Sequence, residues 1–576
     1  MSSYWKVTDE MKIGQQYISI PSENGLSYSP EQKIQIYVGP DTKYMDGHDS
    51  TLNFDFKIGL NGARPTRLQL DEMGGNALIR NIRIYDGTRG QLLEEIESYS
   101  SLCSVRYDYD ADDSIRNHRG LTEGAGTWSA DNRGTQGGSR SLVANTVTNP
   151  YFKKTSGDQS TTFSDADFLT AKVTLPLHTG IFAQNEHIFP IMMTNGLYIE
   201  IDTPPAHEVL KQLDSVLRHR RLYLNPEFHS LNGSTAAPDD WANASSSDTF
   251  YVETTNNLGG NDRVQRFPFV VGEHINFIDT AADIDRVSAF SASPVISEIN
   301  ASTNGLIEVK LSSPVTNNAS TIVAQNWSLY STAVDGQTSY GATYTISNVN
   351  LIVSQVMLDP GYERGMLQKV REGKAIEIDI LTSTNYKHSI LASERQSVFQ
   401  VYANNSRAKS LLVIPQDSTV YTSADAISGR IGYDIVAKNN AQDAWLKSNR
   451  SAYTGVCDEL QTYQYQIEGR LVPSRPVDIS KIATKKSIDA YHLYELEKTL
   501  DNAGIVPRSF RAFQENFCFG RGFAVNQGAM DLRGKDIAVI LKYTGAVAPT
   551  VGKLFNSFVV HVRRFMIRDG GIDVEL

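Results

Sequence analysis

The sequence predicts a mainly β protein, built of sandwiches or jelly rolls with a few short inserted helices. Alternation of apolar and polar residues at a period of two dominates the 576 residues, which is the pattern of strands with one face on a core. Tyr and Phe, at 27 and 22 residues, greatly outnumber Trp at 5, and such aromatic side chains suit a half-buried pleated surface. Helical periodicity is confined to a few short segments.

The clearest strands each place their apolar residues on one face. Leu52, Phe54 and Phe56 share one side of such a segment, whereas Asn53 and Asp55 share the other. By the same pattern, strands are expected at 34–38, 52–58, 307–311, 349–353, 376–380 and 463–467.

The last strong strand, 558–567, is apolar on both faces except for His561, Arg563 and Arg564. A strand that is apolar on both faces is typical of the centre of a sheet. The two arginines alternate in direction, so at least one of them is expected near the core and paired.

Three short helices are expected. Residues 203–217 begin with Thr203 and two prolines and then show apolar residues on one helical face. Residues 488–500 carry leucines at helical spacing, with Gly504 beyond their end. The third helix is expected at 92–103, where apolar residues also form one stripe.

Long polar segments at 123–160 and 230–262 interrupt the strands, and loops of that length are functional or disordered. Turn residues at 359–365 indicate a break that divides the chain into about 350 and about 210 residues. No internal repeat of fixed short period is visible.

The charge balance disfavours a coat protein that neutralises nucleic acid, since 54 basic minus 65 acidic residues gives −11. The three cysteines (Cys103, Cys457 and Cys518) are far apart, so synthesis in a reducing compartment fits better than a disulfide scaffold. The first residues lack the apolar stretch of a signal peptide, and no apolar run approaches 18 residues.

The sequence contains no P-loop, no GxGxxG, no GxSxG elbow and no HExxH helix. We therefore expect no catalytic, cofactor-binding or metal-binding residues and no cofactor, although an enzyme with dispersed residues stays open.

For three polar clusters, a binding site is the alternative interpretation. The acidic run Asp108–Asp113 is expected to be a solvated loop, with an irregular Ca²⁺ site as the alternative. His178 and His187 are expected to pack or lie in a loop, because no further ligands complete a zinc set. The basic run 218–221 is expected at a solvated helix end, with contact to acidic loops of a neighbouring subunit or to nucleic acid as the alternative.

An ordered series of segments resembles the major capsid protein of polinton-like viruses, a group related to virophages. The resemblance runs from about residue 15 to the C-terminus, and no single motif in it is diagnostic. The segments are YISIPSENGL at 17–26, TLPLHTGIF at 174–182, GLYIEI at 196–201, NYKHS at 385–389, NSRAKSLLVIP at 405–415, GRLVPSR at 469–475 and VHVRRF at 560–565.

This resemblance implies a vertical double jelly roll, in which one chain forms two eight-stranded barrels side by side. It divides the chain into an N-terminal arm at 1–14, a first jelly roll at 15–362 and a second at 363–576. Three chains would form a pseudo-hexagonal capsomer that tiles an icosahedral shell around a double-stranded DNA genome.

The implied protein is a structural component of the virion and not an enzyme. Its partners would be further copies of itself, penton proteins and minor capsid proteins, without sequence-specific binding of nucleic acid. The long polar loops would hold neighbouring subunits together. Some members of the family carry a C-terminal extension that is removed, but here the chain stops at residue 576 directly after the last strand.

The sequence leaves open the role of the N-terminal arm and two rival functions. The arm at 1–14, which includes Trp5, could dock on the inner side of a shell or could be a frayed terminus. The rival functions are a β-sandwich adhesin or carbohydrate-binding protein, and a hydrolase that uses a pair of carboxylates on a jelly-roll scaffold.

Overall fold

The structure is a computed structural model and describes residues 12–60, 68–71, 73–111, 119, 122–124, 170–183, 188–212, 227–230, 246–253, 275–279, 294–301, 306–316, 327–331, 342–418, 453–457, 460–479, 490–508, 516–523, 528–543, 552–568 and 570–575.

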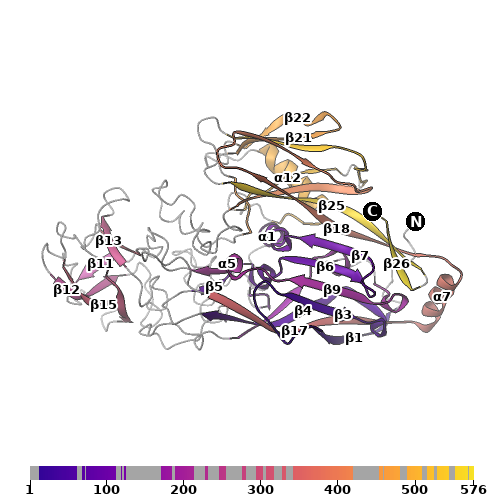
Figure 1. Ribbon diagram of the computed structural model, residues 1–576, viewed down its shortest axis with the longest axis horizontal. Coiled ribbons are helices and arrows are strands. Elements are labelled where there is room, and N and C mark those ends of the chain that lie inside the picture. Colours follow the sequence, from indigo (N-terminus) through magenta and orange to yellow (C-terminus); the bar gives the residue numbers. More distant parts are fainter. Residues whose placement is uncertain are drawn as a thin grey trace.

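The N-terminal half forms two antiparallel sheets that face each other (Figure 1). One sheet has the order β1 (Lys12–Pro21), β17 (Ala342–Leu358), β4 (Tyr44–Leu60) and β8 (Ala171–Pro176), and β2 (Ser27–Tyr28) also pairs with β17. The other sheet has the order β3 (Lys33–Val38), β9 (Leu197–Asp202), β6 (Asn81–Asp86) and β7 (Leu92–Glu97).

The C-terminal half repeats this arrangement with its own two sheets. The first has the order β18 (Ile376–Ile390), β25 (Lys553–Arg568), β20 (Ala408–Asp417) and β23 (Phe519–Gly522), with β26 (Gly571–Glu575) added beside β25. The second has the order β19 (Gln396–Val401), β24 (Ile537–Tyr543), β21 (Leu460–Ile467) and β22 (Arg470–Asp478).

The strand order identifies each half as a jelly roll. If the eight principal strands of a half are numbered along the chain, its sheets have the orders 1-8-3-6 and 2-7-4-5, and both halves give the same result. Two antiparallel four-stranded sheets connected in this way are the jelly-roll form of the β-sandwich. The predicted fold class, a mainly β double jelly roll, is therefore confirmed by the topology itself.

The cores follow the alternation seen in the sequence. Leu52, Phe54, Phe56 and Ile58 of β4 are buried, and the ring of Phe56 lies 5.9 Å from that of Tyr344 on β17. All six strands predicted from alternation are present. The prediction for 558–567 is also confirmed, because β25 lies between β18 and β20 in the centre of its sheet.

A further, six-stranded sheet is inserted between β9 and β17, within the longest connection of the first jelly roll, and Figure 1 shows it beyond one end of that roll. Its strand order is β13 (Ile275–Asp279), β16 (Trp327–Ser331), β11 (Glu227–Ser230), β12 (Ser246–Glu253), β15 (Ile307–Thr316) and β14 (Ile296–Ala301). The loop predicted at 230–262 is thus wrong in part, since β12 pairs with β11 and β15. Apart from residues 123 and 124, the loop predicted at 123–160 lies outside the described residues.

Helix α7 (Pro360–Arg371) connects the two jelly rolls where the sequence indicated a break. It starts there because the Asp359 carboxylate accepts hydrogen bonds from the amides of Gly361 and Tyr362, at 2.8 and 3.1 Å. The predicted boundary at 362/363 falls within this helix and stays a prediction.

Helices α1 (Tyr99–Tyr109) and α12 (Ala490–Asn502) occupy the same connection, between the fifth and sixth strands, of the two rolls. The helix predicted at 488–500 is confirmed as α12, which ends before Gly504 in the left-handed conformation, at φ +69°. The remaining short helices are α4 (Gly180–Ala183), α5 (Ala206–Val209), η2 (Pro40–Thr42), η3 (Gly74–Leu78) and η7 (Ile191–Met193). None of the helices within the described ranges is long and apolar enough to cross a membrane.

The helix predicted at 92–103 is wrong in its first half, where the chain forms β7. The strand is favoured by pairing with β6, which places Arg83 beside Glu95, and their side chains form an ion pair at 2.6 Å. Helix α1 starts only after Ser98, whose backbone is left-handed at φ 53°. Apolar residues at 93 and 96 fit a helical stripe in sequence, but the neighbouring strand decides the conformation.

The helix predicted at 203–217 is also wrong beyond its first turn. Residues 206–209 form α5, but β10 (Leu210–Gln212) then pairs with β5 (Leu68–Leu70), with Leu210 opposite Leu70. Residues 213–217 lie outside the described part. Pairing with a strand distant in sequence overrides the local helical periodicity.

We expect Leu351→Ala to lower the free energy of unfolding by about 2–5 kcal/mol, because Leu351 is fully buried in β17 and its truncation leaves a cavity. Leu26→Ala is the matched control, since Leu26 is 87% exposed and should change stability by less than about 0.5 kcal/mol. Urea unfolding followed by fluorescence measures both, and equal effects would contradict the assigned core.

Candidate functional site: the interface between the two jelly rolls

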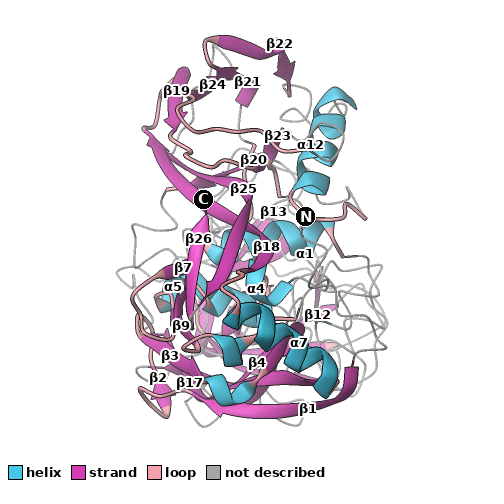
Figure 2. Ribbon diagram, turned by 90° about the vertical axis from the view of Figure 1, so that its right-hand side faces the viewer, coloured by secondary structure: helices cyan, strands magenta, loops and turns pink. Residues whose placement is uncertain are grey.

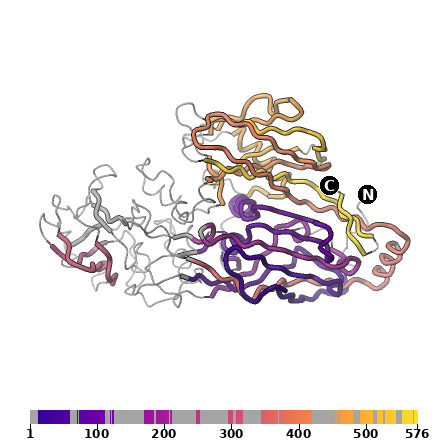
Figure 3. The backbone as a smooth tube through the Cα atoms, viewed as in Figure 1, coloured from indigo at the N-terminus to yellow at the C-terminus, as the bar shows by residue number. Residues whose placement is uncertain are grey.

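The two jelly rolls meet across a buried, polar interface. Strand β7 and helices α1 and α4 of the first roll contact strands β18, β20 and β25 of the second (Figure 2). The end of β25 and strand β26 extend over the first roll (Figure 3), where Thr194 and Gly570 form an isolated bridge. Phe189 and Phe565 pack edge to face across the same region, with ring centroids 6.4 Å apart.

Glu94 on β7 joins elements of both rolls. Its carboxylate accepts hydrogen bonds from the amides of Gly180 and Ile181, at 2.5 and 3.2 Å, and from the Thr382 hydroxyl of β18, at 2.5 Å. Burial raises the pKa of the Glu94 carboxyl, whereas these hydrogen bonds and the nearby Arg563 act in the opposite direction. Glu94 therefore has its hydrogen bonds supplied by protein rather than by water.

The consecutive arginines of β25 have different partners. Arg563 is directed into the interface and donates from Nη1 to the carbonyl of Leu93, at 2.5 Å, and burial lowers its pKa. Arg564 is directed to Asp379, with contacts of 2.8 and 3.1 Å. This confirms the expectation that at least one of the two lies near the core and is paired.

Asp379 is held by two arginines of its own roll. Arg407 contacts both carboxylate oxygens, at 3.0 and 3.2 Å, and Arg564 does so from the other side. Burial would raise the pKa of Asp379, but the two guanidinium groups lower it to about 2. This cluster fixes the end of β25 that crosses to the first roll.

A chain of hydrogen-bonded amides continues the interface from β18 to α1. Asn385 donates to Asn556 Oδ1 at 2.9 Å, and Asn556 in turn donates to Gln416 Oε1 at 2.7 Å. Gln416 donates to the Ser101 hydroxyl at 3.1 Å and to the Tyr453 carbonyl at 2.5 Å. Each group acts as donor to the next, so the chain specifies one alignment of the rolls.

Asn516 connects helix α1 to two segments of the second roll. Its Nδ2 donates to Asp108 Oδ2 at 2.6 Å and to the Ser104 carbonyl at 3.1 Å, and its Oδ1 accepts from the Gly455 amide at 2.8 Å. Its own carbonyl accepts from the Tyr109 hydroxyl at 2.8 Å. Three groups of Asn516 thus make four hydrogen bonds, of which three reach α1 and one reaches the Gly455 segment of its own roll.

The solvated loop predicted at Asp108–Asp113 is wrong for Asp108, which is fully buried in α1. A helix with a buried polar face was not recognisable from the sequence, because the partner, Asn516, lies 408 residues away. Residues 112 and 113 fall outside the described residues.

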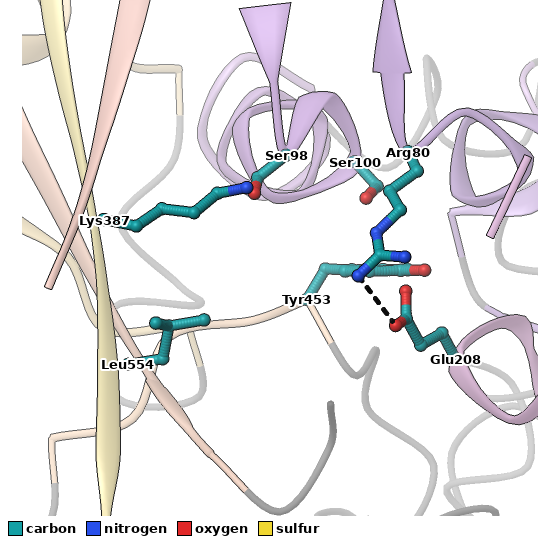
Figure 4. A pocket seen from close by; sticks show the side chains of 7 residues that line it. All are labelled: Arg80, Ser98, Ser100, Glu208, Lys387, Tyr453 and Leu554. Carbon is teal, nitrogen blue, oxygen red and sulfur yellow. Dashed lines mark ion pairs between the residues drawn. The ribbon is translucent and has the colours of Figure 1, made fainter. Parts of the chain in front are cut away.

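A cavity of about 130 Å³ lies where the interface reaches the start of α1 (Figure 4). The first roll and the α5 segment contribute Arg80, Ser98, Ser100 and Glu208, and the second roll contributes Lys387, Tyr453 and Leu554. Arg80 pairs with Glu208 at 3.7 Å, and Lys387 pairs with Glu97 at 3.0 Å.

Of the other candidate residues, some have described positions and the rest lie outside the described part. His178 is partly buried, with a pKa lowered by burial, and its amide donates to the Tyr99 hydroxyl at 2.9 Å. His187, the basic run 218–221 and the first eleven residues, including Trp5, lie outside the described part. Cys103, Cys457 and Cys518 are not joined in disulfide bonds among the described residues. Among the described residues, no group of three His, Cys, Asp or Glu side chains is arranged to hold a metal ion.

Comparison with known proteins found neither a matching family model nor a matching curated protein. Among solved structures, the chain is similar to the PBCV-1 virus capsid, at 9% identity and a TM-score of 0.48 over 100% of both chains. It is also similar to the Sputnik virophage structure, at 8% identity and a TM-score of 0.43, covering 99% of this chain and 90% of the other.

A third similar structure is the mavirus major capsid protein, at 11% identity and a TM-score of 0.35, covering 100% of this chain and 94% of the other. These structures are thus a virus capsid, a virophage and a major capsid protein. The strand order described above defines the double jelly roll independently of these similarities.

We expect Asn516→Ala to destabilise the packing of the two rolls by about 3 kcal/mol or more, because it leaves the Gly455 amide and the Ser104 carbonyl without their buried partner. Limited proteolysis and thermal unfolding measure the effect. Asn404→Ala is the control, since Asn404 is exposed and should unfold as the wild type does. Identical behaviour of the two variants would show that the interface does not depend on this side chain.

A second prediction concerns pH. Burial lowers the pKa of His561, in β25, from 6.5 to about 4. Between these two pH values the imidazole is therefore protonated in the unfolded chain but neutral in the folded one. Stability from this group is fully present above pH 6.5 and is lost as the pH falls towards 4. The melting temperature of His561→Gln should therefore fall less than that of the wild type over this interval, whereas His48→Gln, at an exposed position, should follow the wild type. Parallel curves for all three proteins would contradict the assignment.

Proposed function

We propose that this protein is a major capsid protein that assembles as a trimer into a pseudo-hexagonal capsomer of an icosahedral virus. The observation that carries the proposal is the repeated strand order, 1-8-3-6 and 2-7-4-5, in two complete jelly rolls of one chain. Jelly rolls are found in viral capsid domains as well as in lectins. Each chain contains two similar jelly rolls in a fixed orientation. A trimer would therefore contain six jelly rolls, which gives the pseudo-hexagonal outline.

Threefold closure explains why such a chain would be an effective building block. A heterologous contact between the first roll of one subunit and the second roll of the next closes a ring after three steps. The contact repeats only if the two rolls keep one mutual orientation in every copy. The buried hydrogen bonds of Glu94 and Asn516 provide that constancy within the chain.

The inserted sheet and the polar segments are proposed to hold neighbouring subunits together. The connection between β9 and β17 carries a six-stranded sheet beyond the end of the first roll, where it adds surface without altering either barrel. Obligate interfaces usually bury more than about 2,000 Å², which is more than sheet edges alone supply.

We further propose the arm at 1–14, the first roll at 15–362 and the second at 363–576 as the functional units of the chain. The protein would reside in the virion shell and contact penton and minor capsid proteins. A net charge of −11 supports the view that other, basic proteins contact the double-stranded DNA genome. In this role the chain acts by burying surface and not as an enzyme.

We expect the purified chain, expressed alone, to form a trimer of 3 × 63.8 kDa, about 191 kDa, in light scattering. Negative-stain images should show a hexagonal outline with threefold symmetry. Asn516→Ala should lower the yield of trimers, and the exposed-site control Asn404→Ala should not.

A folded monomer that does not associate over a range of salt and pH would count against the proposal. Saturable binding of that monomer on a glycan array would instead favour the adhesin or carbohydrate-binding reading.

A further inference from the structure

We propose that the edge of the second roll formed by β22 and α12 binds the β1 edge of the first roll in a second copy of this chain. This contact, which rests on the capsid function proposed above, would join consecutive chains of the trimer. Within one chain, the fifth strand of the first roll, β7, lies against the first strand of the second roll, β18. Between chains, the fifth strand of the second roll, β22, would lie in the same way against the first strand of the next first roll, β1.

The contact between β7 and β18 shows how two such edges are held together. The Thr382 hydroxyl of β18 donates to the Glu94 carboxylate of β7 at 2.5 Å. Two further side chains of β18 reach Glu97, since Asn385 donates to its carbonyl at 3.3 Å and Lys387 pairs with its carboxylate at 3.0 Å. Both strands lie at the edges of their own sheets, so each roll covers an edge of the other. A sheet edge that is left uncovered is a place where another chain can bind.

The counterpart strands, β1 and β22, are uncovered in the described part of the chain. Among the described strands, β1 pairs with β17 alone and β22 with β21 alone. Ile13 and Tyr17 of β1 are each 63% exposed, and Leu471 of β22 is 49% exposed. Met357 of β17, opposite Gly14 of β1, adds another exposed apolar side chain. Large apolar side chains gathered at free sheet edges indicate surfaces that become covered on association.

Helix α12 extends the surface beside β22. It contacts β22 and exposes Tyr491 and Tyr494. Helix α1, in the same connection of the first roll, is instead buried against the second roll, where its Ser104 carbonyl and Tyr109 hydroxyl bond to Asn516. Exposed tyrosines are typical of protein interfaces. The two helices therefore differ in the same way as β7 and β22 do, one covered within the chain and the other left for a partner.

The two uncovered surfaces lie on opposite sides of the chain, so they meet only between copies. Figure 1 shows β22 at the top and β1 at the bottom, with β18 and β7 between them, and Figure 2 shows the same order from the side. A contact between two unlike surfaces is heterologous, and its repetition closes a ring or continues as a filament. A second copy of the chain is the partner that fits both surfaces at once.

Charged side chains favour the same pairing. Arg470 and Arg475 of β22 are exposed and form no ion pair with another described residue. Asp49 is exposed beside β1, where its carboxylate accepts a hydrogen bond from Gln15 at 3.0 Å. Opposite charges on two surfaces speed their association and select one orientation. The arginines of β22 would therefore lie near the Asp49 carboxylate of the next chain.

A chain with cysteines on both surfaces tests the contact directly. We expect Tyr17→Cys combined with Leu471→Cys to be joined by a short bismaleimide into a covalent trimer of 3 × 63.8 kDa, about 191 kDa. Each single variant should stay without this cross-link, because the contact joins unlike surfaces. Tyr17→Cys combined with Tyr402→Cys is the control, since Tyr402 is exposed next to β19, at the opposite edge of the sheet from β22. It should give no covalent trimer.

Aspartate substitutions measure how much the contact contributes to assembly. Leu471→Asp and Tyr17→Asp should each raise the concentration at which half of the chains are trimeric about tenfold or more, because each buries a carboxylate in an apolar contact. The matched controls are Val398→Asp and Tyr402→Asp, at positions 55% and 68% exposed, and both should assemble as the wild type does. All four positions are exposed in the single chain, so the variants should fold. Mass photometry of a dilution series measures the trimer fraction.

The outcomes separate this contact from the capsid function. If the wild type forms trimers but the double cysteine variant is not cross-linked, or if Leu471→Asp and Val398→Asp dissociate at the same concentration, the contact is wrong and the capsid function stands. A wild type that stays monomeric at every concentration would overturn both.

Discussion

Buried hydrogen bonds across the interface between the jelly rolls are the constraint on which the rest of the molecule depends. Glu94 and Asn516 each have protein groups from both rolls around them, at positions closed to water. An apolar interface could slide with little penalty, whereas a hydrogen-bonded one loses several partners when it shifts. A shift of one roll against the other would therefore break several buried hydrogen bonds at once.

The repetition of one topology with different connections explains how the chain combines regularity with variation. Both rolls keep the same strand order and both place a helix, α1 or α12, between the fifth and sixth strands. The additional material is concentrated between β9 and β17 of the first roll. Insertions in loops leave the hydrogen bonds of the sheets intact. The surface that contacts other proteins can therefore change while the sheets of the two jelly rolls stay the same.

The cavity at the start of α1 lies where this polar interface opens, and its composition follows from that position. The first roll contributes the ion pair of Arg80 and Glu208, at 3.7 Å, and the second roll contributes Tyr453 and Leu554. Arg80 and Lys387 bring cations to the same point.

Strand alternation, the central position of 558–567 and helix α12 were determined by the sequence itself, because burial of one face at a fixed period is a local property of the chain. Tertiary structure decided what the local pattern left ambiguous. Residues 92–97 and 210–212 have helical spacing but form strands, since pairing partners distant in sequence supply their hydrogen bonds. Asp108 became a buried interface residue rather than a solvated one for the same reason, because its partner Asn516 is close only in the folded chain.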